Sequence, residues 1–71
     1  MQTIEFTLRG EFVALCDLLK LTGVADSGGQ GKALVAAGEV SVDGQPESRK
    51  TAKIRAGQSV VCRDTLIMVV A

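Results

Sequence analysis

The sequence of 71 residues contains no histidine, no tryptophan and no tyrosine. Histidine is the side chain that most often acts as a general base, and it is also the commonest metal ligand. The acidic residues stand singly, without the close pairs that hydrolytic or metal sites use. These absences argue against most enzyme chemistry, and we expect a non-catalytic protein with no cofactor and no metal.

Long apolar runs are also missing, because no stretch approaches the roughly 20 residues of a membrane-spanning helix. The first residues have neither the basic start nor the apolar run of a signal peptide. The two cysteines, Cys16 and Cys62, are far apart and lack metal-ligand spacing. We expect both thiols to be free and buried in a cytoplasmic protein that forms one domain, residues 1–71, around an aliphatic core.

The N-terminal part of the chain predicts a strand followed by a helix. Apolar residues alternate with polar ones at Ile4, Phe6 and Leu8, which is typical of a strand with one buried face. From Glu11 to Leu21 the apolar residues instead follow the i, i+3, i+4, i+7 spacing of an amphipathic helix: Phe12, Leu15, Cys16 and Leu19. Thr22-Gly23 ends this helix, and the short turn after it predicts a helical hairpin.

The central segment predicts a capped helix and a tight hairpin. Ser27 and Gln30 have the spacing of a capping box, so a second helix should begin there. Gly38 stands where a left-handed C-terminal cap is expected. After it, Val40–Val42 alternates toward Asp43-Gly44, which is a strong hairpin turn signal.

Three glycines in the first turn of this second helix need an explanation, since each costs about 1 kcal/mol relative to alanine in a helix interior. Gly31 shares a helical face with apolar residues, so we expect it to pack closely against a neighbour. For Gly28 and Gly29, close packing and access of a phosphate to the helix N-terminus remain equal alternatives. The segment lacks the G-x-x-x-x-G-K-[ST] spacing of a nucleotide-hydrolysing phosphate loop.

The C-terminal part predicts further strands around a basic run. Pro46 cannot donate a ladder hydrogen bond and therefore belongs to a sheet edge. Residues 48–55 form the basic run, in which Ile54 is the one clear core anchor. Two aliphatic runs then predict a terminal hairpin: Ser59–Arg63 and Leu66–Val70, with the turn at Asp64-Thr65.

The formal net charge is zero, but the charges are distributed unevenly. Residues 1–48 carry three basic and seven acidic side chains, whereas residues 49–71 carry five basic side chains and one acidic. A partner that senses local potential therefore meets a basic patch on a protein that is neutral as a whole.

The order of these features is similar to that of the small RNA-binding domain named after ribosomal small-subunit protein four, here the S-four domain. The resemblance covers most of residues 12–62 and is closest to the short stand-alone bacterial members. Gly28 and Ala14 stand where many members carry arginine. The matching positions are Ser27, Gln30, Lys32, Leu34, Val35, Gly38, Val40, Val42, Asp43, Gly44, Glu47, Arg49, Lys50, Lys53, Ile54 and Gly57.

This resemblance implies an α+β fold, in which an N-terminal strand and a helical hairpin pack on a small, mostly antiparallel sheet (an αL-like RNA-binding motif). It implies that a monomer binds structured RNA, ribosomal or ribosome-associated, without a membrane or small-molecule substrate. The binding surface would be formed by the second helix and the following hairpin: Lys32, Arg49, Lys50, Lys53, Arg55 and Lys20. Both aromatic residues, Phe6 and Phe12, stand at core spacing, so we expect contacts to phosphates and 2′-hydroxyls rather than base stacking.

Two other functions are compatible with the same residues. A protein-interaction module would pair the exposed sheet edge near Pro46 with a strand of its partner. A helix-turn-helix DNA binder would use two short helices joined by a tight turn. Its reading helix, residues 28–37, would offer Gln30 and Lys32 but otherwise mostly glycine and alanine.

Overall fold

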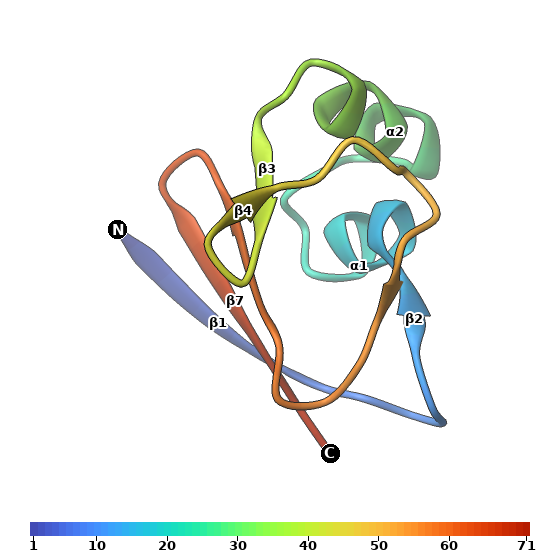
Figure 1. Cartoon of the computed structure of the whole chain (residues 1–71), viewed down its shortest axis with the longest axis vertical. Helices are drawn as coiled ribbons and strands as arrows, with labels where there is room; N and C mark the ends of the chain where they lie inside the picture. The colour runs from blue at the N-terminus through green and yellow to red at the C-terminus, as the bar shows by residue number, and fades with distance from the viewer.

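The computed structural model describes residues 1–71 and contains a five-stranded sheet (Figure 1). Across the sheet the strands are β1 (Gln2–Thr7), β7 (Thr65–Val70), β6 (Ser59–Cys62), β3 (Val40–Val42) and β4 (Gln45–Pro46). The β1–β7 pair is parallel and the other three pairs are antiparallel, which confirms the prediction of a mostly antiparallel sheet.

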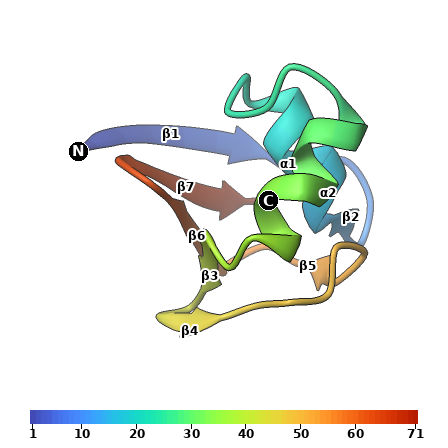
Figure 2. The ribbon, with the colours of Figure 1, turned by 90° about the horizontal axis from the view of Figure 1, so that it is seen from above.

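Two helices, α1 (Leu15–Leu21) and α2 (Gly28–Ala36), form the predicted helical hairpin. They lie together on one side of the sheet (Figures 1 and 2). The core between helices and sheet is aliphatic, as expected from the composition. Its largest fully buried side chains are Leu15, Leu18, Leu19, Ile54, Ile67, Val35, Val40, Val60, Val69 and Cys62. Neither helix is long and apolar enough to cross a membrane.

The predicted start of the first helix at Glu11 is wrong, because α1 begins at Leu15. The preceding residues form a short strand, β2 (Val13–Ala14), which pairs antiparallel with β5 (Lys53–Ile54). Val13 is β-branched, and its partner Ile54 is buried in the core, so this pairing outcompetes another helical turn. Phe12 is consequently not a core residue, and its exposed fraction is 42%.

The ends of α2 confirm the predicted caps with one difference in detail. The Ser27 hydroxyl oxygen accepts a hydrogen bond from the Gln30 N–H at 3.1 Å. The Gln30 side chain accepts from the Asp26 N–H, whereas a standard capping box would use the N–H of the cap residue itself. Gly38 follows the helix with φ 77°, as a left-handed cap requires.

Both predicted hairpins are present. Asp43 and Gly44 have positive φ, 52° and 83°, in the turn between β3 and β4. The terminal hairpin turns at Arg63-Asp64 rather than at the predicted Asp64-Thr65, because Thr65 pairs with Cys62 as the first residue of β7. Both cysteines are free and buried, as predicted, and burial raises the pKa of the Cys62 thiol.

Candidate nucleic-acid interface

All six predicted binding residues are exposed to solvent: Lys20, Lys32, Arg49, Lys50, Lys53 and Arg55. Only two of the eight basic residues of the chain form an ion pair, Arg49 with Glu47 and Arg63 with Glu39. The other cations have no acidic partner within 4.0 Å. Their positive charge is therefore available to an anionic ligand.

The basic loop between β4 and β5 is anchored by its backbone to the first turn of α1. The Leu15 N–H donates to the carbonyl oxygen of Ala52 at 2.9 Å, and the Cys16 N–H donates to that of Lys50 at 3.0 Å. Ala14, the N-cap residue of α1, makes no side-chain hydrogen bond to the helix. The loop carbonyl oxygens instead accept from backbone N–H groups of the first turn, which would otherwise lack partners. These bonds fix the backbone of Lys50 against α1.

The close approach of the two helices brings Lys32 to the same region. A Cβ atom added to Gly31 would lie 2.7 Å from the carbonyl oxygen of Cys16. Gly31 therefore packs directly on the α1 backbone, which confirms the packing interpretation of this glycine. Lys32 is the next residue in α2, so the residue before Lys32 and the backbone of Lys50 both contact Cys16.

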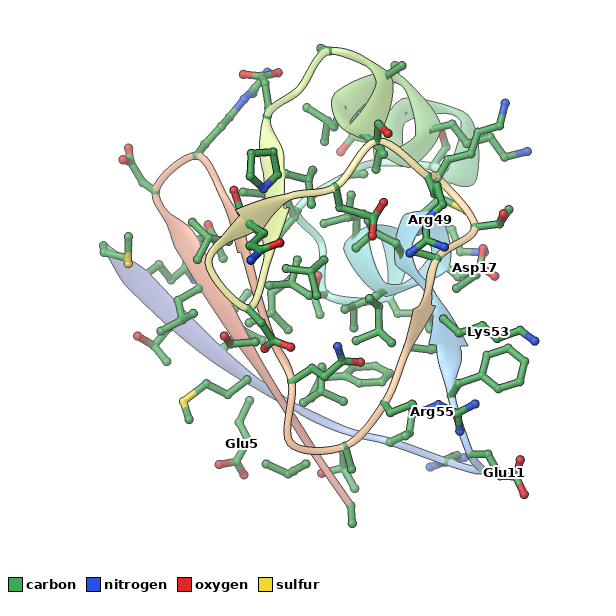
Figure 3. All side chains as sticks on the ribbon, in the orientation of Figure 1. Glu5, Glu11, Asp17, Arg49, Lys53 and Arg55 are labelled. Carbon is green, nitrogen blue, oxygen red and sulfur yellow. The ribbon has the colours of Figure 1, made fainter.

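Lys53 lies in β5 of the second, two-stranded sheet, and Arg55 follows this strand. They flank Ile54, which is buried, and both are exposed. A shallow hollow of about 430 Å³ lies beside them and is lined by Arg49, Thr51, Ala52 and Lys53. Figure 3 shows Arg49, Lys53 and Arg55 along one side of the molecule, with Asp17 and Glu11 on that side in the same view.

Arg49 differs from the other cations because it is held by an acidic neighbour. Its side chain donates two hydrogen bonds to the Glu47 carboxylate, each at 3.2 Å, and its backbone N–H donates a third at 3.0 Å. These hydrogen bonds lower the pKa of Glu47, so the pair is fully charged at neutral pH. Any anionic ligand of this guanidinium would therefore have to compete with Glu47.

A hydrogen-bond network around Asp43 holds the segment that follows β5. The Asp43 carboxylate accepts from the Ser59 N–H and from the Gln58 side-chain amide, each at 3.0 Å. The Gln58 side-chain oxygen, Oε1, accepts in turn from the Arg55 backbone N–H at 2.7 Å. The Ser59 bond is the larger cause of a lowered pKa for Asp43, and Gln58 lowers it further. The Asp43-Gly44 turn thus supports the backbone at Arg55.

No hydrogen bond links Lys20 to the basic loop between β4 and β5. It lies in the last turn of α1 and is exposed, three residues after the exposed Asp17. Its distance along the helix from Cys16 is about 6 Å, calculated from the 1.5 Å rise per residue. Lys20 thus lies further along the same helix from the point at which the loop and α2 meet.

Phe12 lies beside Lys53 and Arg55, although its spacing in the sequence predicts a core residue. The Nζ atom of Lys53 lies 5.0 Å from the centroid of the Phe12 ring, and the Cζ atom of Arg55 lies 5.9 Å from it. Both distances are within the range of cation–π attraction. The alternation Lys53-Ile54-Arg55 and the β-branched Val13 each indicate a strand. The sequence does not show that these two strands pair with each other, because they are far apart along the chain.

Comparison with known proteins identifies the same family as the resemblance in the sequence. The S4 domain family, which is the S-four domain, matches residues 6–70. YbcJ of Escherichia coli (strain K12) and YbcJ of Shigella flexneri are each 52% identical over 59 residues, which is 83% of this chain and 84% of theirs.

The solution structure of YbcJ from E. coli is similar over 100% of this chain and 91% of its own, with a TM-score of 0.77 and 46% identity. That structure is described as revealing an αL motif involved in RNA binding. The extent of these matches leads to one conclusion: this chain belongs to the S4 domain family.

Proposed function

We propose that this chain is a non-catalytic monomer that binds structured RNA, of the ribosomal or ribosome-associated class. The proposed surface, here called the basic face, consists of Lys32, Arg49, Lys50, Lys53, Arg55 and Lys20. The observation that carries the proposal is the backbone bond from Cys16 to Lys50, together with the contact of Gly31 on Cys16. These contacts support the proposal, because they bring the residue before Lys32 and the backbone of Lys50 to the same residue of α1.

The similarity to YbcJ favours RNA over other anionic partners. YbcJ is similar to this chain in both sequence and fold over most of their lengths, and its motif is described as involved in RNA binding. An A-form helix presents phosphates and 2′-hydroxyls across a wide, shallow minor groove. Exposed lysine and arginine side chains on a fixed backbone suit such a target, because phosphate contacts position a protein without reading bases.

The alternative functions have weaker structural support. The free edge at β4 is only two residues long and includes Pro46, so it is a poor template for a partner strand. The exposed side of α2 carries alanine beside Gln30 and Lys32, which offers a DNA reading helix few donors or acceptors. Neither feature accounts for the exposed cations Lys50, Lys53 and Arg55, which form no ion pair.

The test is a gel shift with hairpin RNA, single-stranded RNA and duplex DNA at two salt concentrations. About four phosphate contacts, from the basic residues other than Arg49 and Lys20, imply a log-log salt slope near −3 to −4. The expected loss of affinity between 50 and 200 mM salt is roughly a hundredfold. Changing Arg49, Lys50 and Lys53 together to glutamate should abolish binding to hairpin RNA. Equal binding by this variant and the parent would contradict the proposal.

Single substitutions provide matched controls. Lys50→Gln and Arg63→Gln change the net charge equally, but Arg63 lies on the β6–β7 turn and is paired with Glu39. We expect Lys50→Gln to weaken binding and reduce the salt slope by about 1, and Arg63→Gln to change neither. Glu47→Gln should strengthen binding, because it releases Arg49 from its ion pair. A preference for duplex DNA, or no RNA binding by the parent, would favour the alternatives.

A further inference from the structure

Phe12 is an exposed aromatic residue that lies between two cations. Its exposed fraction is 42%, while Lys53 Nζ and Arg55 Cζ lie 5.0 Å and 5.9 Å from its ring centroid. The other aromatic residue of the chain, Phe6, packs against the core. Phe12 is therefore the more exposed of the two aromatic side chains.

The position of Phe12 follows from the pairing of β2 with β5. Val13 is opposite Ile54 and Ala14 is opposite Lys53, so one further step in this antiparallel register places Phe12 opposite Arg55. Side chains alternate along each strand, and those opposite or diagonal to one another are neighbours. Since Ile54 points into the core, Phe12, Lys53 and Arg55 share the outer surface of this small sheet.

A groove continues from Phe12 toward the N-terminal strand. Its volume is about 480 Å³, and its apolar lining comes from Phe6, Leu8, Phe12, Val13 and Leu21. Arg9, which has no acidic partner within 4.0 Å, also lines it. The groove lining also includes one acidic residue, Glu5. The two cations at the Phe12 ring, with Arg9 in the lining of the groove, match a ligand that combines a flat aromatic surface with negative charge.

We propose that Phe12 is a stacking platform for one unpaired base of the bound RNA, and that Lys53 and Arg55 contact the phosphates next to that base. This inference rests on the proposed function, because it adds a base contact at the end of the basic face. A nucleotide carries both the π-surface and the anion that this arrangement suits. Lys53 has a flexible stem, so its ammonium can leave the ring for a phosphate when a base takes its place.

The platform predicts a preference that phosphate contacts alone do not produce. Stacking on an aromatic side chain is sequence-tolerant, because every base has a π-face, but it requires a base that is not already paired and stacked. The protein should therefore bind an RNA stem with one unpaired nucleotide more tightly than the same stem fully paired. An abasic residue in place of that nucleotide should remove the preference, since the phosphate remains and the base does not.

The experiment measures affinities for three hairpins: fully paired, with one bulged adenosine, and with an abasic bulge. Phe12→Leu keeps an apolar side chain without a π-face, and Met68→Ala removes a comparably exposed apolar side chain from β7 as a control. We expect Phe12→Leu to lose about five- to a hundredfold in affinity for the bulged hairpin and little for the paired one. Met68→Ala should bind all three hairpins like the parent.

Phe12→Trp supplies a direct fluorescence readout of base stacking, because the parent chain contains no tryptophan or tyrosine. Its fluorescence should be quenched by the bulged hairpin and not by the abasic one. Equal affinity of Phe12→Leu and parent for the bulged hairpin, or equal quenching by both bulges, would overturn the platform and leave the proposed function standing. Failure of the parent to bind any hairpin would overturn both proposals.

Discussion

Replacement of Gly31 by alanine tests the contact that positions the two helices. The added Cβ would lie 2.7 Å from the carbonyl oxygen and 3.3 Å from the Cα atom of Cys16, whereas ordinary contact begins near 3.4 Å. Both atoms belong to the backbone of α1, so no side-chain rotation relieves the clash. The helices must separate, and separation disturbs the packing of Leu34 and Val35, which lie on the buried side of α2.

Two opposing effects set the change in the free energy of unfolding for Gly31→Ala. Overpacking of this kind costs about 1 to 3 kcal/mol. Alanine in place of glycine within a helix returns about 1 kcal/mol. We therefore expect Gly31→Ala to lower the free energy of unfolding by up to about 2 kcal/mol. That is a large fraction of the stability of a small domain.

Gly29→Ala is the matched control in the same helical turn. Its added Cβ would have only the Ser27 hydroxyl oxygen nearby, at 3.8 Å, so it should be neutral or stabilising. The difference between the two variants isolates the overpacking cost of about 1 to 3 kcal/mol. Urea denaturation followed by circular dichroism measures it, since the chain has no tryptophan or tyrosine fluorescence. The reasoning is refuted if Gly31→Ala is as stable as Gly29→Ala.

Two further substitutions test other local contacts. Ser27→Ala removes the acceptor for the Gln30 N–H and should lower the free energy of unfolding by about 1 kcal/mol, measured in urea; an unchanged midpoint would show that the cap contributes nothing. The folded-state pKa of Asp43 lies below its ordinary 3.8, so its carboxylate stabilises the fold above that value, and this stabilisation is lost as the pH falls through the folded pKa. Asp43→Asn should accordingly lose less stability than the parent between pH 5 and pH 3, and parallel pH profiles would contradict this account.

The sequence by itself determined the features that depend on nearby backbone. Ser27 caps a helix whose first donors lie within three residues, and Gly38 ends the same helix because it adopts a positive φ. The Asp43-Gly44 turn is equally local. Such signals act over a few residues, so they are visible without knowledge of the fold, and the exposure of the basic side chains follows from their chemistry.

Tertiary structure alone decided where α1 begins and which side chains are neighbours. The apolar spacing of Phe12 fits a helix, but Val13 pairs with Ile54 in a distant segment, and this pairing turns Phe12 outward beside two cations. Likewise, only the fold brings Gly31, the residue before Lys32, and Lys50 to Cys16, through a helix contact and a backbone hydrogen bond. Both outcomes depend on nonlocal backbone pairing, in which a segment competes for partners that local sequence patterns do not identify.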